Sequence, residues 1–168
     1  AILRKFGKAG QVVLDPFCGS GTTLVEARLL GFNAIGVDVN GLSSLLSKVK
    51  STPLSGDELQ EIEVFIKRIE SEQLAWLNKR PIIKVKEIEG LDHWFQHNVA
   101  EEITHILNFV NSLENENVRD FLRIVLSSII VKVSNQESDT RFVAKNKNIS
   151  NNIYFFVKKK KKGGHKLN

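Results

Sequence analysis

The chain has 168 residues, enough for one domain or for part of a larger one, and its apolar share suits a folded protein rather than a disordered one. Its formal net charge is +5, but the lysines of 158–162 supply all of the excess, so charge is poor independent evidence for a nucleic-acid partner. No apolar run could cross a bilayer, and no signal peptide is recognisable, so we expect a cytoplasmic protein. A single cysteine, Cys18, excludes internal disulfides and cysteine-built metal sites.

The first residues of the chain predict a short helix followed by a short buried strand. Ile2, Leu3 and Phe6 share one helical face, and Gly10 separates this helix from the strand. The strand consists of 12–15, because the following proline cannot donate to a sheet ladder.

A glycine turn joins this strand to a helix. Gly19 and Gly21 allow a tight turn and leave bare backbone for a ligand. Residues 22–30 have helical spacing and good helix formers, and Gly31 ends the helix. The free N–H groups at the start of that helix form a positive pocket.

A second strand, 33–37, carries Asp38 at its end. In nucleotide-binding folds a carboxylate at this place accepts hydrogen bonds from the two ribose hydroxyls. A dinucleotide-binding fold would have glycine where this chain has Leu24. Such a fold would also not explain the Asp-Pro-Phe sequence at 15–17. A strand, turn and helix without any ligand is the plainer alternative.

The run 15–23, Asp-Pro-Phe-Cys-Gly-Ser-Gly-Thr-Thr, followed by Gly-Val-Asp at 36–38, resembles the S-adenosylmethionine site of the DNA amino-methyltransferases. The resemblance implies S-adenosylmethionine as cofactor and an α/β fold. We expect this chain to form a Rossmann-like methyltransferase half, with two parallel strands and flanking helices. A helical insertion follows, and the sheet is incomplete. It implies that the cofactor-binding residues are Asp15, Phe17, Cys18, Gly19, Ser20, Gly21, Thr22, Asp38 and Val39. Asp38 would hold the ribose, Val39 would pack against the adenine, and Cys18 is a small residue beside the loop.

Helices dominate the next part of the chain. Leucines and a valine at helical spacing mark a short helix over 42–49, with Lys48 and Lys50 on its solvated face. Ser55 and Glu58 form a capping box that opens a helix running to about residue 77.

Two further helices are expected over 99–113 and 118–133. We predict three regions: a cofactor-binding half over 1–53, a helical insertion over 54–142, and a return segment with a lysine-rich tail over 143–168.

Between these helices lie aromatic and histidine side chains. Trp94 and Phe95 could stack on a base, but such a pair more often anchors one helical layer on another. His93 and His97 are four residues apart, a spacing that can share a metal. Since no carboxylate pattern completes a set, we predict no metal site.

The catalytic box of the family is absent from this chain. In these enzymes a polar residue, two prolines and an aromatic residue orient the amine of a base flipped out of double-stranded DNA, and position it for methyl transfer. Here the prolines are Pro16, Pro53 and Pro81, and no two are adjacent. We therefore predict no catalytic residues in this chain, and cofactor binding without methyl transfer.

The resemblance implies that the complete enzyme methylates the exocyclic amine of adenine or cytosine in DNA, in prokaryotic restriction–modification. This chain would be its N-terminal-side fragment, preceded by further residues. We interpret the lysine run as a frame slip at an adenine-rich stretch of the gene. Two alternatives remain: a fragment of an RNA methyltransferase, and a non-catalytic scaffold that keeps the cofactor loop. Nothing in the sequence indicates the oligomeric state.

Overall fold

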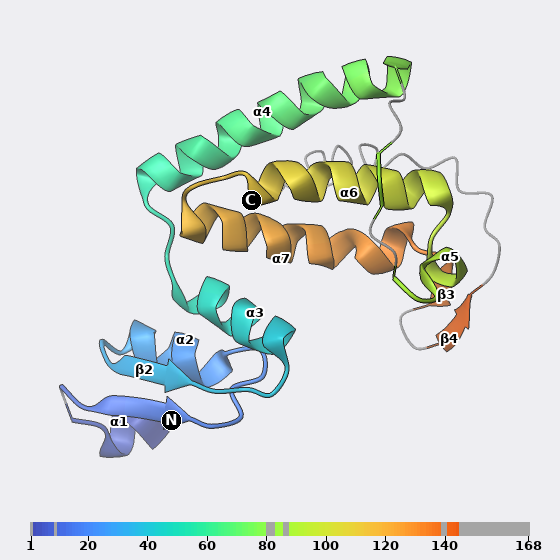
Figure 1. Ribbon diagram of the computed structural model, residues 1–168. Coiled ribbons are helices and arrows are strands. Elements are labelled where there is room, and N and C mark those ends of the chain that lie inside the picture. Colours follow the sequence, from blue (N-terminus) through green and yellow to red (C-terminus); the bar gives the residue numbers. More distant parts are fainter. Residues whose placement is uncertain (1, 9, 80–82, 86–87, 139–140, 145–168) are drawn as a thin grey trace, which may run out of the picture. The chain divides into compact units, whose positions relative to one another are not determined.

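The computed structural model describes residues 2–8, 10–79, 83–85, 88–138 and 141–144 (Figure 1). The elements in chain order are α1 (Ile2–Phe6), β1 (Val12–Asp15), α2 (Thr22–Leu29), β2 (Asn33–Gly36), α3 (Gly41–Ser51), α4 (Gly56–Lys79), α5 (Leu91–Trp94), α6 (His97–Asn111), α7 (Glu116–Val133), β3 (Gln136–Ser138) and β4 (Arg141–Ala144). They form two compact units: a first unit of 1–59 with 115–124, and a second unit of 60–114 with 125–168.

In the first unit, two parallel strands lie against helix α2. β1 and β2 pair from Val12 opposite Asn33 to Asp15 opposite Gly36. The connection between them is the predicted glycine turn and helix α2, which ends just before Gly31 takes a positive φ of 77°. This mixed α/β fold, with two parallel strands and flanking helices, confirms the predicted fold class.

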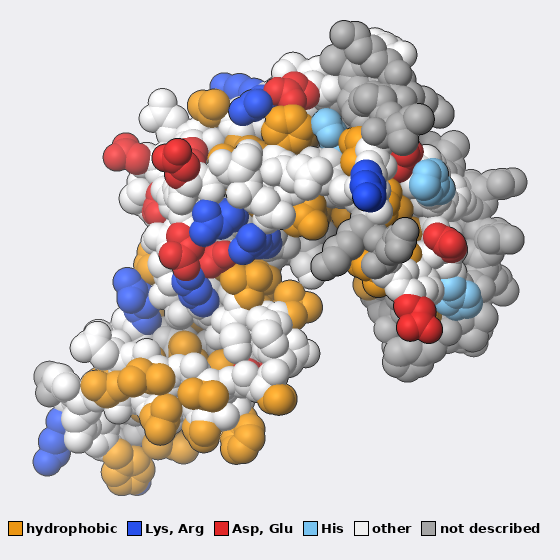
Figure 2. Space-filling model, in the orientation of Figure 1, with side chains coloured by type: hydrophobic (Ala, Val, Ile, Leu, Met, Phe, Trp, Pro, Cys, Tyr) orange, Lys and Arg blue, Asp and Glu red, His pale blue; other side chains and the backbone are white. Residues whose placement is uncertain are grey.

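The two faces of this strand pair differ. Gly36 lies on the face toward α2, because a Cβ placed there would come within 2.8 Å of the Leu24 side chain. On the other face, Val12, Leu14 and Ile35 are 56%, 63% and 55% exposed, and we call these three residues the bare sheet face. In Figure 2 hydrophobic side chains gather at this end of the first unit. The prediction of a buried strand over 12–15 is therefore wrong for this face, because no described element packs on it. Parallel sheets are normally covered on both faces, so this exposure is unusual.

The second unit is helical and has an aliphatic core. Side chains of α6 and α7 form a buried cluster, with partly buried residues packed against it: Val99, Leu126, Ile129 and Val133, then Phe95, Ile103, Ile106 and Leu107. The predicted helices over 99–113 and 118–133 are confirmed as α6 and α7. Phe95 contacts this cluster, which agrees with the anchoring role predicted for the aromatic pair.

The capping box at the start of α4 is confirmed. The Ser55 N–H donates to the Glu58 carboxylate at 2.7 Å, and the Glu58 N–H donates to the Ser55 hydroxyl at 3.2 Å. Together these bonds satisfy two backbone donors at the helix start. The helix continues to Lys79, close to the predicted end.

The strands β3 and β4 and the short helix α5 were not anticipated from the sequence. β3 and β4 form a short antiparallel pair with a register irregularity. Of the predicted return segment and lysine tail, only 143–144 lie within the described residues, at the end of β4. Among the helices described, none has the length and apolar character that a membrane span requires.

Candidate functional site

The candidate site lies at the carboxyl ends of β1 and β2, where the glycine turn meets the loop that follows β2. The N–H of Cys18 donates to the Val37 carbonyl at 3.0 Å, and the N–H of Val37 donates to the Asp15 carbonyl at 2.9 Å. These bonds extend the contact between the two chain segments beyond the last paired residues. In open α/β sheets, ligands bind in the crevice at the carboxyl ends of the strands.

The turn itself depends on glycine. Gly19 and Gly21 have φ values of 48° and 82°, in the left-handed region that side chains disfavour. The Gly21 N–H donates to the Cys18 carbonyl at 2.7 Å and closes the turn. A Cβ added at Gly19 would meet no atom within 4 Å, so the backbone there is open to its surroundings.

Asp38 ties the loop after β2 to the glycine turn. Its Oδ2 accepts a hydrogen bond from the Gly19 N–H at 2.9 Å, and its Oδ1 accepts one from the Asn40 N–H at 2.8 Å. Each carboxylate oxygen has two acceptor positions, so one remains on each for a ligand hydroxyl. Asp15 makes a local hydrogen bond instead, since its Oδ1 accepts one from the Phe17 N–H at 3.1 Å.

Two apolar side chains project into solvent beside these loops. Phe17 is 87% exposed, and Val39 is fully exposed at 104%. Ser20 and Thr22 are exposed as well, whereas Cys18 and Gly21 are buried. The structure therefore brings the nine predicted residues together at the end of β1, the glycine turn, the start of α2 and the loop after β2. Four of them are exposed, and only Cys18 and Gly21 are buried.

Ser47 of α3 is a contributor that the sequence analysis missed. It is buried, and the Cys18 thiol lies 3.5 Å from its hydroxyl, which donates to the Ser44 carbonyl at 2.9 Å. A Cβ on Gly21 would come within 2.7 Å of the Ser47 Cα, so the turn and α3 are in close contact. The available signal was a row of serines at helical spacing, 43, 44, 47 and 51, where small residues permit close approach.

Lys48 was predicted to lie on the solvated face of its helix, but in the structure it forms ion pairs. Its ammonium pairs with the carboxylates of Glu116 and, at 2.7 Å, Asp120. The hydrogen bonds to Asp120 and then Glu116 raise the pKa of Lys48 above its ordinary value of 10.5. Partners this distant in sequence leave no local pattern for a sequence analysis to detect.

No group of three histidine, cysteine, aspartate or glutamate side chains suited to a metal ion occurs within the described part of the chain. His97 instead faces Glu101 one turn along its own helix, at 3.6 Å.

Comparison with known proteins gives one family match. Residues 1–41, which include the glycine turn and Asp38, match the DNA methylase model for N6 and N4 methyltransferases. No solved structure matches significantly.

Curated relatives extend this similarity along the chain. The chain is 30% identical to the type II methyltransferase M.MvaI of Kocuria varians over 129 residues, which are 74% of this chain and 28% of that protein. It is 24% identical to the type II methyltransferase M.BsoBI of Geobacillus stearothermophilus over 144 residues, which are 84% of this chain and 27% of that protein. The chain thus spans little more than a quarter of each.

A shorter similarity leads to an RNA enzyme. The tRNA (guanine(10)-N2)-dimethyltransferase of Methanocaldococcus jannaschii is 54% identical over 33 residues, 20% of this chain and 9% of that protein.

Proposed function

We propose that this chain, which belongs to the N6/N4 DNA methylase family and is a distant relative of type II DNA methyltransferases, binds S-adenosylmethionine at its glycine turn. The family uses this cofactor. The observation that carries the proposal is the bond between the Asp38 carboxylate and the Gly19 N–H, because it fixes the turn and the carboxylate as one unit.

The residues of the two loops fit the parts of this cofactor. Asp38 retains acceptor positions for the ribose hydroxyls, and the exposed Val39 offers an apolar surface for the adenine. Gly19 and Gly21 let the methionine part lie against backbone. When bound, S-adenosylmethionine supplies a methyl group on a sulfonium, which an amine can accept.

In the complete enzyme, the acceptor would be the exocyclic amine of adenine or cytosine in DNA, with the base flipped out of the duplex. The similarity to two type II methyltransferases extends over most of this chain, and it supports DNA as the substrate class. The sequence has no adjacent prolines, and hence no box of the kind that holds the target amine. We propose that this chain binds the cofactor and transfers no methyl group by itself.

Calorimetry of the 168-residue chain with S-adenosylmethionine tests cofactor binding. We expect binding by the wild type and at least about tenfold weaker binding by Asp38→Asn, since a hydrogen bond to a charged group contributes about 1.5–3 kcal/mol and about 1.4 kcal/mol is tenfold. Asp57→Asn, an exposed carboxylate at the start of α4, serves as the matched control and should bind like the wild type. Absence of binding by a folded wild type would favour the scaffold alternative.

RNA methylation is the second candidate, favoured by the 33-residue similarity to a tRNA methyltransferase. Incubation of the chain with tritiated cofactor and either duplex DNA or tRNA tests the predicted inactivity and, if label is transferred, the substrate class. No incorporation into either is the expected result for this chain. Label in DNA would refute the predicted inactivity, and label in tRNA alone would replace DNA as the substrate.

A further inference from the structure

An ion-pair cluster lies between α3 and the start of α7, both within the first unit. Lys48 on α3 pairs with Glu116 and with the Asp120 carboxylate at 2.7 Å, and Arg123 lies 3.4 Å from the other Asp120 oxygen. Lys48 and Asp120 are 72 residues apart in sequence. The cluster therefore fixes two segments that the chain itself does not hold together.

Asp120 is the buried member of this cluster. Its side chain is 8% exposed, whereas those of Lys48 and Glu116 are 43% and 64% exposed. A buried carboxylate that loses its partner is strongly unfavourable, whereas an exposed pair contributes little. Arg123 lies on the same helix as Asp120 and cannot connect it to α3, so the Lys48–Asp120 pair should carry most of the link between α3 and α7.

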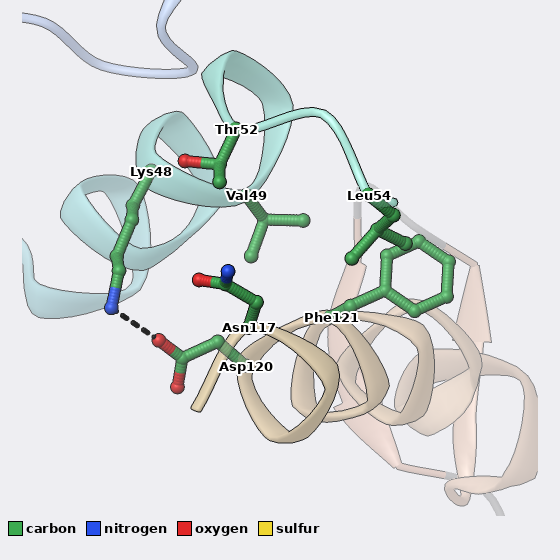
Figure 3. A pocket seen from close by; sticks show the side chains of 7 residues that line it. All are labelled: Lys48, Val49, Thr52, Leu54, Asn117, Asp120 and Phe121. Atoms are coloured by element: carbon green, nitrogen blue, oxygen red, sulfur yellow. Dashed lines mark hydrogen bonds and ion pairs between the residues drawn. The ribbon is translucent and has the colours of Figure 1, made fainter. Parts of the chain in front are cut away.

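Close packing surrounds the pair. In Figure 3 the Lys48 side chain reaches from α3 to the Asp120 carboxylate on α7. The other residues that line the space are Val49, Thr52, Leu54, Asn117 and Phe121. The cavity that they enclose has a volume of about 10 Å³, roughly one water, so it is a packing gap and not a ligand site.

The neighbouring residue connects this cluster to the glycine turn. Ser47 precedes Lys48, and successive residues of a helix point in directions about 100° apart. Ser47 is buried beside the Cys18 thiol and Gly21, while Lys48 reaches α7. α3 is therefore held by the glycine turn through one residue and by α7 through the next.

We propose that Lys48 and Asp120 are positioning residues, whose ion pair holds α3 so that Ser47 stays packed against the glycine turn. Loss of the pair lets α3 move away from the turn, which exposes Cys18 and loosens the loop that carries Gly19 and Gly21. The effect on cofactor affinity rests on the proposed function, but the effect on Cys18 does not.

Cys18 provides a direct measurement, because it is the only cysteine and is buried. The rate at which its thiol reacts with dithiobisnitrobenzoate reports how often the turn and α3 separate. We expect Lys48→Met to raise this rate about tenfold, within the range of coupling between contacting residues. Lys50→Met, an exposed lysine of the same helix, is the matched control and should react like the wild type.

A conservative variant separates positioning from general destabilisation. Lys48→Arg keeps the charge and should restore a slow reaction. A thiol rate in Lys48→Met equal to that of the wild type would overturn the proposal, whatever the change in overall stability. If Lys48→Met does not fold, Asp120→Asn gives the same test, since it removes the negative charge and keeps the shape.

Calorimetry with S-adenosylmethionine then gives the second readout. We expect the dissociation constant of Lys48→Met to rise about threefold to tenfold, with Lys50→Met unchanged. A faster thiol reaction in a chain that never binds the cofactor would support the positioning and refute the proposed function. An unchanged thiol rate in a chain that binds the cofactor would do the reverse.

Discussion

The strand and loop region of the first unit and the helical core of the second unit use apolar side chains in opposite ways. In the helical core, the large aliphatic residues Val99, Leu126 and Ile129 are buried against one another. Around the glycine turn, one large residue, Leu24, is buried beside small ones such as Cys18 and Ser47, while Phe17 and Val39 face solvent. The buried aliphatic side chains of the helical core stabilise the fold by themselves. The exposed apolar side chains around the glycine turn are suited instead to contact with a ligand or another surface.

The largest expected effect sharpens this comparison directly. Leu126→Ala should lower the free energy of unfolding by about 2–5 kcal/mol, because it removes buried methyl groups and leaves a cavity. Leu14→Ala, on the bare sheet face, should change it by no more than about 0.5 kcal/mol. Urea denaturation followed by circular dichroism measures both. Equal losses in the two variants would show that the bare sheet face is covered in solution and would break the comparison.

Close packing in the strand region gives the next effect. Gly36→Ala should cost about 1–3 kcal/mol, because its Cβ would lie 2.8 Å from Leu24 and 3.0 Å from Cys18. Gly56→Ala is the control: its Cβ would meet nothing within 4 Å, and alanine favours the helix that starts there. We expect the control to be neutral or slightly stabilising in the same denaturation. A Gly36→Ala variant as stable as its control would contradict the tight packing.

The cap of α4 should produce a smaller, pH-dependent effect. Hydrogen bonds from the Ser55 N–H and then the Asn117 amide lower the pKa of Glu58 below its ordinary value of 4.5. A lowered pKa gives stability that is present above the unfolded value and lost as the pH falls through the folded value. The midpoint of thermal unfolding should therefore be higher in the wild type than in Glu58→Gln at about pH 6, and the gap should close towards about pH 3.

Glu63→Gln removes an exposed carboxylate on the same helix that makes neither cap bond, and it is the matched control. We expect this variant to unfold close to the wild type. A constant difference between wild type and Glu58→Gln across the pH range would mean that the cap bonds do not depend on the ionised carboxylate.

The smallest expected effect lies on the surface of α4. Arg68 and Glu72 form an i,i+4 ion pair at 2.8 Å, with side chains 60% and 37% exposed. Glu72→Gln should cost at most about 0.5 kcal/mol, and the difference should vanish in about 1 M salt. Denaturation at low and high salt measures it. A loss comparable to that of Leu126→Ala would mean that surface charge, rather than the aliphatic core, holds the second unit.

Local patterns account for what the sequence predicted. The strand before Pro16, the helix stop at Gly31, and the Ser55–Glu58 cap each follow from residues close together in the chain, and the structure confirms all three. The two long amphipathic helices were predicted for the same reason. The cofactor roles of the nine residues stay predictions, although the structure does bring those residues together.

What the sequence could not supply depends on partners far apart in the chain. The Lys48–Asp120 pair joins residues 72 positions apart, and the contact of Ser47 with Gly21 depends on how α3 packs. The irregular pairing of β3 and β4 has no alternating apolar pattern to reveal it. Periodicity and turn residues describe single elements, whereas these contacts form only after the elements pack.

The bare sheet face also bears on how long the chain survives in a cell. Two parallel strands with an apolar face more than half exposed present the kind of surface that chaperones and proteases recognise. Side chains that cover Val12, Leu14 and Ile35 would hide it, whether they come from the same polypeptide or from another. A chain whose sheet face stays bare should therefore be cleared from a cell faster than one in which that face is covered.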